Sequence, residues 1–184
     1  MTTTDALLFA YDALGGTVQG KTNLQKKMYF LGVMLQEDFG YGPHYYGPYS
    51  SGVAAANQQL KALGYVSESK AAGSTDRSGF EIVRHDFRLT PDAQEVIAAK
   101  KKGLREDWER VERAVHRLNR AGNLNYMELS IAAKAYFLLD QRGKPAGAGD
   151  LVRLAHQFGW TVTEQEVEKA VGFLGCLELA TVAA

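Results

Sequence analysis

The chain has 184 residues, 46% of them hydrophobic and 23% charged, which is the composition of an ordinary globular protein rather than a disordered one. Lysine and arginine together number 21, as do aspartate and glutamate, so the composition excludes an overall basic surface for nucleic acid. The single cysteine, Cys176, excludes an intramolecular disulfide and a multi-cysteine metal site, and its apolar neighbours predict a buried thiol.

Residues 1–90 predict three helices followed by a β-hairpin. Apolar side chains at helical spacing predict helices over 5–14, 24–38 and 51–63, and glycines follow each of them closely. Alternating apolar and polar residues then predict strands over 65–69 and 80–90, joined by a turn-rich segment. This order is that of a winged helix-turn-helix lobe, in which the third helix reads DNA and the hairpin is the wing.

Residues 91–121 predict one long helix that connects the first lobe to the rest of the chain. Thr90 stands where a helix cap belongs, and Pro91 falls in the first turn. Such a helix packs its apolar seam either on the chain's own core or on a second copy, and the sequence leaves both open. The homodimer that we expect as one arrangement would use the heptad-spaced residues Leu104, Trp108, Val111 and Val115.

Residues 122–184 predict a C-terminal lobe of three helices and a short final strand, with the order of a degenerate second helix-turn-helix. Thr163 and Glu166 have the spacing of a capping box at the start of the last helix. The expected fold is therefore α+β and mostly helical, with lobes at 1–90 and 122–184 joined by the helix at 91–121. No stretch resembles a signal peptide or a membrane span, so we expect a cytoplasmic protein with no membrane partner.

The segment GGTVQGKT, residues 15–22, matches the phosphate-binding loop of nucleotide-binding proteins letter for letter. A true loop of this kind follows a buried parallel strand, whereas the residues before Gly15 have helical spacing and include two aspartates. The segment AYFLLD at 135–140, which imitates the strand with a metal-binding aspartate, also has helical spacing. Nucleotide binding is therefore a remote alternative, and we expect Lys21 to be a solvated residue at a helix start.

Three fragments, GKTNLQKKMYFL, HYYGPYSSGV and LKALGYV, follow one another over residues 20–66. In their order and spacing the chain resembles the YwgA-like family of uncharacterised prokaryotic proteins and, more distantly, the Panacea antitoxin domain. The Tyr-Gly-Pro-Tyr-Ser turn is the most specific part of the match, whereas Lys27 stands where an apolar residue is expected. The resemblance implies a winged-helix-like fold, and it carries no catalytic residue across to this chain.

A DNA-binding hypothesis follows from the winged-helix order. Serine, asparagine and glutamine on the third helix would face base edges, while lysines and arginines of the wing and the next helix would contact phosphates. The third helix carries only one positive charge, which weakens this hypothesis because phosphate contacts supply much of the affinity for DNA. The residues predicted for this surface are Ser51, Asn57, Gln58, Lys61, Arg77, Arg84, Lys100, Lys101 and Lys102.

A protein-binding hypothesis, with an antitoxin-like or adaptor role, rests on the tyrosine-rich segment 41–49. Tyrosines make good contact surfaces, because each ring brings apolar area and a hydroxyl at a small entropic cost. The candidates are Tyr45, Tyr46 and Tyr49, although packing against the lobe's own core is the expected alternative for Tyr46 and Tyr49. Duplex DNA and protein are nearly equal as predicted partners, with a slight preference for a regulatory role on DNA.

Catalysis is the least favoured hypothesis. The four histidines, at positions 44, 85, 116 and 156, have no metal-ligand spacing on a helix, and no nucleophile motif is present. Residues that are distant in the sequence can still meet in a folded site, so the sequence does not exclude an enzyme. We predict a non-enzymatic regulatory binding protein with no catalytic residues, no cofactor and no metal.

Overall fold

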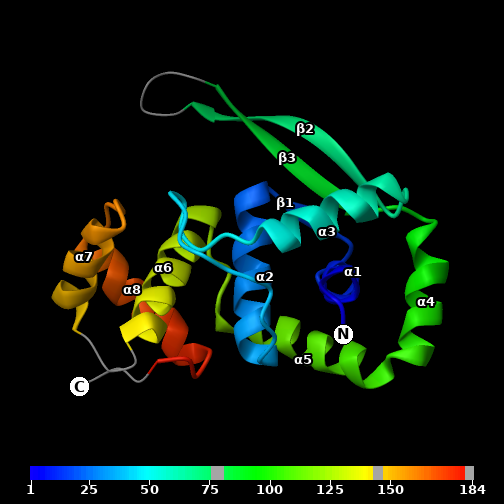
Figure 1. The fold of residues 1–184 in the computed structure, drawn as a ribbon. Helices are drawn as coiled ribbons and strands as arrows, with labels where there is room; N and C mark the ends of the chain where they lie inside the picture. Colours follow the sequence, from blue (N-terminus) through cyan, green and yellow to red (C-terminus); the bar gives the residue numbers. More distant parts are fainter. Residues whose placement is uncertain (76–80, 143–146, 181–184) are drawn as a thin grey trace.

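The computed structural model describes residues 1–75, 81–142 and 147–180 (Figure 1). Over these residues the protein is α+β and mostly helical, with eight helices and one three-stranded antiparallel sheet, as the sequence predicts at this level. In chain order the elements are α1 (Thr3–Ala13), β1 (Thr17–Gln19), α2 (Lys21–Leu35), α3 (Ser51–Ala62), β2 (Val66–Thr75), β3 (Glu81–Leu89), α4 (Ala93–Gly103), α5 (Arg105–Ala121), α6 (Tyr126–Arg142), α7 (Ala148–Gln157) and α8 (Glu164–Cys176).

The sheet has the order β1-β3-β2, so the short strand β1 pairs with the far strand of the hairpin. Val18 of β1 lies opposite Phe87 of β3, and both side chains are buried, as is Val66 at the start of β2. The hairpin is longer than the sequence predicts, because β2 continues through residues expected to form the turn. Beyond its buried base the hairpin projects away from the helices as an arm (Figure 1).

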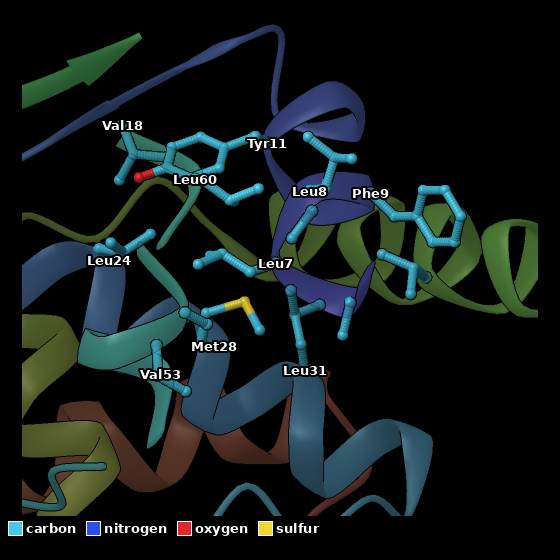
Figure 2. Close-up of a cluster of buried hydrophobic side chains, with 14 of the residues drawn as sticks. Leu7, Leu8, Phe9, Tyr11, Val18, Leu24, Met28, Leu31, Val53 and Leu60 are labelled. Carbon is cyan, nitrogen blue, oxygen red and sulfur yellow. The ribbon is translucent and has the colours of Figure 1, made fainter. Parts of the chain in front are cut away.

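The first hydrophobic cluster joins α1, α2, α3, the sheet and α5. Helix α1 is its centre, since seven consecutive residues of this helix are buried. Figure 2 shows Leu7 of α1, Met28 of α2 and Leu60 of α3 among the side chains that converge there. Thr2 caps α1 by accepting a hydrogen bond from the Asp5 backbone amide, so a side chain satisfies one of the free donors at the helix start.

A second hydrophobic cluster joins α6, α7 and α8 to the opposite side of α2. Tyr29 and Phe30 of α2 belong to it, and the Phe30 ring meets Phe173 of α8 at a centroid distance of 5.6 Å. The three predicted C-terminal helices are confirmed, as is the capping box of Thr163 and Glu166. Helix α2 therefore belongs to both clusters and separates them.

Two details of the C-terminal part differ from the prediction. Within the described residues, which end at 180, no strand follows α8. Cys176 is exposed rather than buried, because α8 turns Phe173, Leu174 and the following Leu177 toward the second cluster instead. No described helix is both long and apolar enough to cross a membrane.

The predicted continuous helix at 91–121 is wrong: α4 and α5 are separate helices that meet at Leu104. Leu104 has φ −127° and ψ 43°, outside the helical region, and it follows Gly103, which has a low helix propensity. The two helices therefore run in different directions around the first cluster (Figure 1).

The predicted dimer seam packs inside the chain. Val111 and Val115 are 0% and 1% exposed in the first cluster, because α5 lies against α1 and α2. Leu104 and Trp108 pack against the same cluster and are partly buried. The seam residues thus belong to the chain's own core, and a second copy cannot reach Val111 or Val115 in this fold.

Replacing Val111 with Ala tests this assignment. We expect the variant to lower the free energy of unfolding by about 2 kcal/mol, because two buried carbon atoms are lost and a small cavity is left. Urea unfolding measures this change, and light scattering of the same samples measures the mass. The exposed Glu112→Ala on the same helix is the matched control. A reduced mass of Val111→Ala without a loss of stability would contradict the intramolecular packing.

Candidate functional site

The tyrosine turn, residues 41–49, lies between α2 and α3 and presents three aromatic rings to solvent. Tyr45, Tyr46 and Tyr49 are 71%, 58% and 38% exposed, so the predicted core packing of Tyr46 and Tyr49 is wrong. The Tyr45 and Tyr46 rings meet edge to face at 4.9 Å, and the His44 ring lies 5.1 Å from that of Tyr49. These contacts gather four rings into one exposed aromatic group.

Backbone pairing closes the turn. The amide of Gly42 donates to the Tyr49 carbonyl at 3.0 Å, and the amide of Tyr49 donates back at 2.9 Å. Gly47 has φ 91°, a conformation that side-chain-bearing residues rarely adopt. A Cβ atom at this position would also lie 3.0 Å from Cγ of Lys134, so a glycine is needed both for the turn and for its contact with α6.

A buried glutamine on α2 holds the C-terminal end of the turn. The Gln25 side-chain amide donates to the Ser50 carbonyl, and its oxygen accepts from the Ser50 amide, each at 3.0 Å. The Ser50 hydroxyl donates to the Phe39 carbonyl and accepts from the Val53 amide, which also caps α3. All these groups are buried, so the start of α3 and the end of the turn have one fixed geometry.

Lys26, the next residue on α2, is 1% exposed and carries its amine into the interior. Its Nζ donates to the Pro48 carbonyl at 2.6 Å. No carboxylate pairs with this amine among the described residues, so a charged lysine would lose its hydration without gaining an opposite charge. Burial and the nearby Lys134 lower the pKa of Lys26 to about 7.

Helix α6 and Trp160 support the turn from the side of the second cluster. Ser130 Oγ donates to the Tyr46 carbonyl at 2.6 Å, and the buried Trp160 Nε1 donates to the His44 carbonyl at 2.7 Å. The Lys134 amine lies 5.5 Å from the centre of the Trp160 ring, within reach of a cation–π contact. Side chains of α2 and α6, together with Trp160, thus fix the backbone beneath the exposed rings.

The helix predicted to read DNA presents few polar side chains. Ser51 and Gln58 of α3 are exposed as expected, but Asn57 is buried and accepts a hydrogen bond from the Tyr11 hydroxyl at 2.8 Å. The prediction that Asn57 faces a partner is therefore wrong, because this asparagine pairs with the phenol of α1. Lys61 is partly buried and forms an ion pair with Glu68 of β2.

The predicted phosphate-binding cations are largely paired within the chain. Arg84 donates two hydrogen bonds of 2.8 Å to Asp86. Lys100 pairs with Asp5 at 2.5 Å and Lys101 with Asp12 at 2.7 Å, so α4 uses these lysines to hold α1. Lys102 is exposed, and Arg77 lies outside the described residues.

The segment that matches a phosphate-binding loop has a different structure. Its middle residues form β1, which pairs antiparallel with β3 and follows helix α1 rather than a buried parallel strand. The segment 135–140 lies within α6 and is helical, as its spacing predicts. Lys21 is exposed at the first position of α2. In the described part of the chain, no three histidine, cysteine, aspartate or glutamate side chains lie together as metal ligands would.

The sequence indicates the tyrosine-rich turn but not the exposure of Tyr46 and Tyr49, and it misses the side chains that hold the turn. The local sign of these supporting residues is that Gln25 and Lys26 fall among the buried positions of α2. A polar residue inside an apolar helix face implies a buried hydrogen bond, but the partner is 22 residues away in the case of Lys26 and 25 in the case of Gln25.

The buried amine of Lys26 predicts a distinct pH dependence of stability. Below pH 7 the folded and unfolded chains both carry the proton, and the full cost of burying the charge is present. Above pH 7 the folded chain releases the proton before the unfolded chain does, so stability should rise by about 3 kcal/mol toward pH 10. Lys26→Met should remove most of this rise, because it removes the titrating group.

Urea unfolding at intervals from pH 6 to pH 10 measures this effect. The control is Lys102→Met, which replaces an exposed lysine and should keep the rise. The interpretation fails if Lys26→Met and the unsubstituted protein show the same dependence on pH.

Comparison with protein-family models finds no match to this chain, and none of the curated proteins compared with it matches either. The resemblance to the YwgA-like family over residues 20–66 therefore stays a prediction. The residues that carry it are nevertheless connected in space, since Gln25 and Lys26 bind the backbone of Ser50 and Pro48.

Proposed function

We propose that this protein is a regulatory binding protein that contacts another protein through the tyrosine turn. The observation that carries the proposal is the exposure of Tyr45, Tyr46 and Tyr49 on a backbone held by buried hydrogen bonds. Three solvated tyrosines in nine residues form a surface of the kind that binding sites use, since aromatic residues are enriched in protein interfaces.

The support beneath the turn strengthens the proposal. A mobile aromatic loop would lose conformational freedom on binding, whereas a turn already fixed by Gln25, Lys26 and Ser130 has little left to lose. Three buried polar side chains, Gln25, Lys26 and Ser130, bind the backbone of this one segment.

Photo-crosslinking in cells tests the proposal, because the adduct itself carries the partner. With benzoylphenylalanine at position 45, we expect irradiation to give one discrete adduct, since this ring is the most exposed of the group. Tyr46→Ala in the same chain should reduce the adduct about tenfold, which corresponds to the loss of one strong aromatic contact. Mass spectrometry then identifies the partner.

The control places the same cross-linker at Val83, an exposed apolar position on the hairpin. Adducts of equal pattern and intensity from positions 45 and 83, or none from position 45, would argue against the tyrosine turn as the binding surface.

DNA binding through a winged-helix-like lobe is the second candidate. It is supported by the order α1-β1-α2-α3-β2-β3 and by the sheet order β1-β3-β2, in which a projecting hairpin follows the third helix. The charges favour it less, since Lys61, Arg84, Lys100 and Lys101 each have a carboxylate partner. A phosphate would have to compete with these ion pairs.

Fluorescence anisotropy with random duplex DNA separates the two candidates. We expect a Kd weaker than about 10⁻⁴ M at physiological salt and a shallow dependence on salt, because few unpaired cations line the described part of this surface. Micromolar binding that weakens steeply with salt, and that is reduced by Lys70→Ala on the exposed face of β2, would instead favour DNA as the partner.

A further inference from the structure

A cavity of about 390 Å³ lies between the C-terminal end of α2 and helix α6, away from the exposed tyrosine rings. Gly32 allows the chain that follows α2 to close one side of it. A Cβ atom on Gly32 would lie 3.0 Å from the Phe39 ring and 3.1 Å from the Glu37 carbonyl, so a glycine favours this close approach. Residues 36–39 and α6 therefore form facing walls.

The charge of the cavity is negative. Glu37, Asp38 and Asp140 line it, and no described lysine or arginine does. Glu37 is partly compensated by Arg110 at 3.5 Å. Asp140 is exposed and has no ion pair within the described residues. Gly32, Val33 and Gln36 at the C-terminal end of α2 also line the cavity, and a helix C-terminus carries partial negative charge.

Three tyrosines form the aromatic side of the cavity. The Tyr29 ring lies 5.0 Å from that of Tyr41 and 6.2 Å from that of Tyr136, both at steep angles. The Tyr41 hydroxyl donates to the Gln25 carbonyl, so this ring is held in place. Rings arranged in this way present π faces and hydroxyl oxygens, both of which attract cations.

Tyr29 gives the cavity an unused acceptor. This residue is only 6% exposed, yet its hydroxyl makes no hydrogen bond to any described residue. Burial, and then the charge of Asp140, raise the pKa of this hydroxyl, so Tyr29 stays a neutral phenol beside a carboxylate. Its oxygen is therefore available to a donor that enters the cavity.

We propose that this cavity binds an organic cation, the ammonium or guanidinium group of a molecule the size of a lysine or arginine side chain. The carboxylates of Asp38 and Asp140 supply charge, the three rings supply cation–π contacts, and the Tyr29 oxygen accepts a hydrogen bond from the ligand. The cavity shares Tyr41 with the tyrosine turn but none of the exposed rings Tyr45, Tyr46 and Tyr49. Substitutions at Asp140 and at Tyr46 therefore test the two proposals separately.

Titration with n-butylammonium chloride tests the proposal on the full chain, with n-pentanol as the neutral probe of similar shape. Proton–carbon NMR of ring-labelled tyrosines reports binding at Tyr29, Tyr41 and Tyr136 directly. We expect saturable shifts of these three signals with the cation, at least about tenfold tighter than with the alcohol, since charge and π contacts each add to affinity.

Two variants locate the determinants. Asp140→Asn should weaken the cation about tenfold and leave the alcohol unchanged, because it removes a charge and keeps the shape. Tyr29→Phe should weaken the cation severalfold, because it removes only the free hydroxyl. Glu112→Gln, which neutralises an exposed carboxylate on α5, is the matched control and should have no effect.

A second titration, with a lysine-containing peptide, identifies the source of the cation. A blocked tripeptide with a central lysine that binds tighter than n-butylammonium indicates a side chain of a partner protein, and the reverse order indicates a free amine. Equal affinities for n-butylammonium and n-pentanol, or no shift at the three tyrosines, would overturn the proposal. An unchanged Asp140→Asn would overturn it as well.

Discussion

Helix α2 is buried on opposite faces, and both halves of the molecule pack against it. Leu24, Met28 and Leu31 enter the first cluster, whereas Tyr29 and Phe30 enter the second. Helices usually bury one stripe and solvate the other, so a helix buried all round must lie between two packed bodies. The chain accordingly folds its N-terminal elements against one side of α2 and its last three helices against the other.

Two polar residues of α2, Gln25 and Lys26, lie on its buried faces, and the interior has to accommodate them. Gln25 and Lys26 find their partners in the backbone of residues 48–50 and thereby order the segment that leads into α3. Burying the lysine costs more free energy than burying the glutamine. The glutamine exchanges two hydrogen bonds with Ser50, whereas the lysine amine has one acceptor and no counter-ion among the described residues. The backbone of the tyrosine turn is thus held in part by a buried amine whose pKa is lowered by burial.

The sequence predicts those features that local spacing encodes. Most helices, the hairpin and the capping box of Thr163 follow from periodicity and short-range pairing, but the break at Leu104 does not. Composition indicates the tyrosine-rich turn but not the exposure of Tyr46 and Tyr49. The sequence could not predict whether a seam faces a second copy or the chain itself, because Val111 has the same spacing in both cases. The prediction for Asn57 is wrong for a similar reason, since its partner Tyr11 lies 46 residues earlier. The cavity at α2 and α6 brings together residues over 100 positions apart, and no local pattern marks it.

The division of the interior into two clusters gives each half of the molecule its own tryptophan. Trp108 lies at the margin of the first cluster, partly in water, with the amine of Lys101 4.2 Å from its ring centre. Trp160 is fully enclosed in the second cluster and stacks on Phe158 at 5.1 Å. The two indoles therefore differ in the polarity of their surroundings, and we expect them to emit at different wavelengths. Variants that keep only Trp108 or only Trp160 would report separately on each side of α2. Their fluorescence during unfolding would therefore show whether the two halves of the protein unfold together.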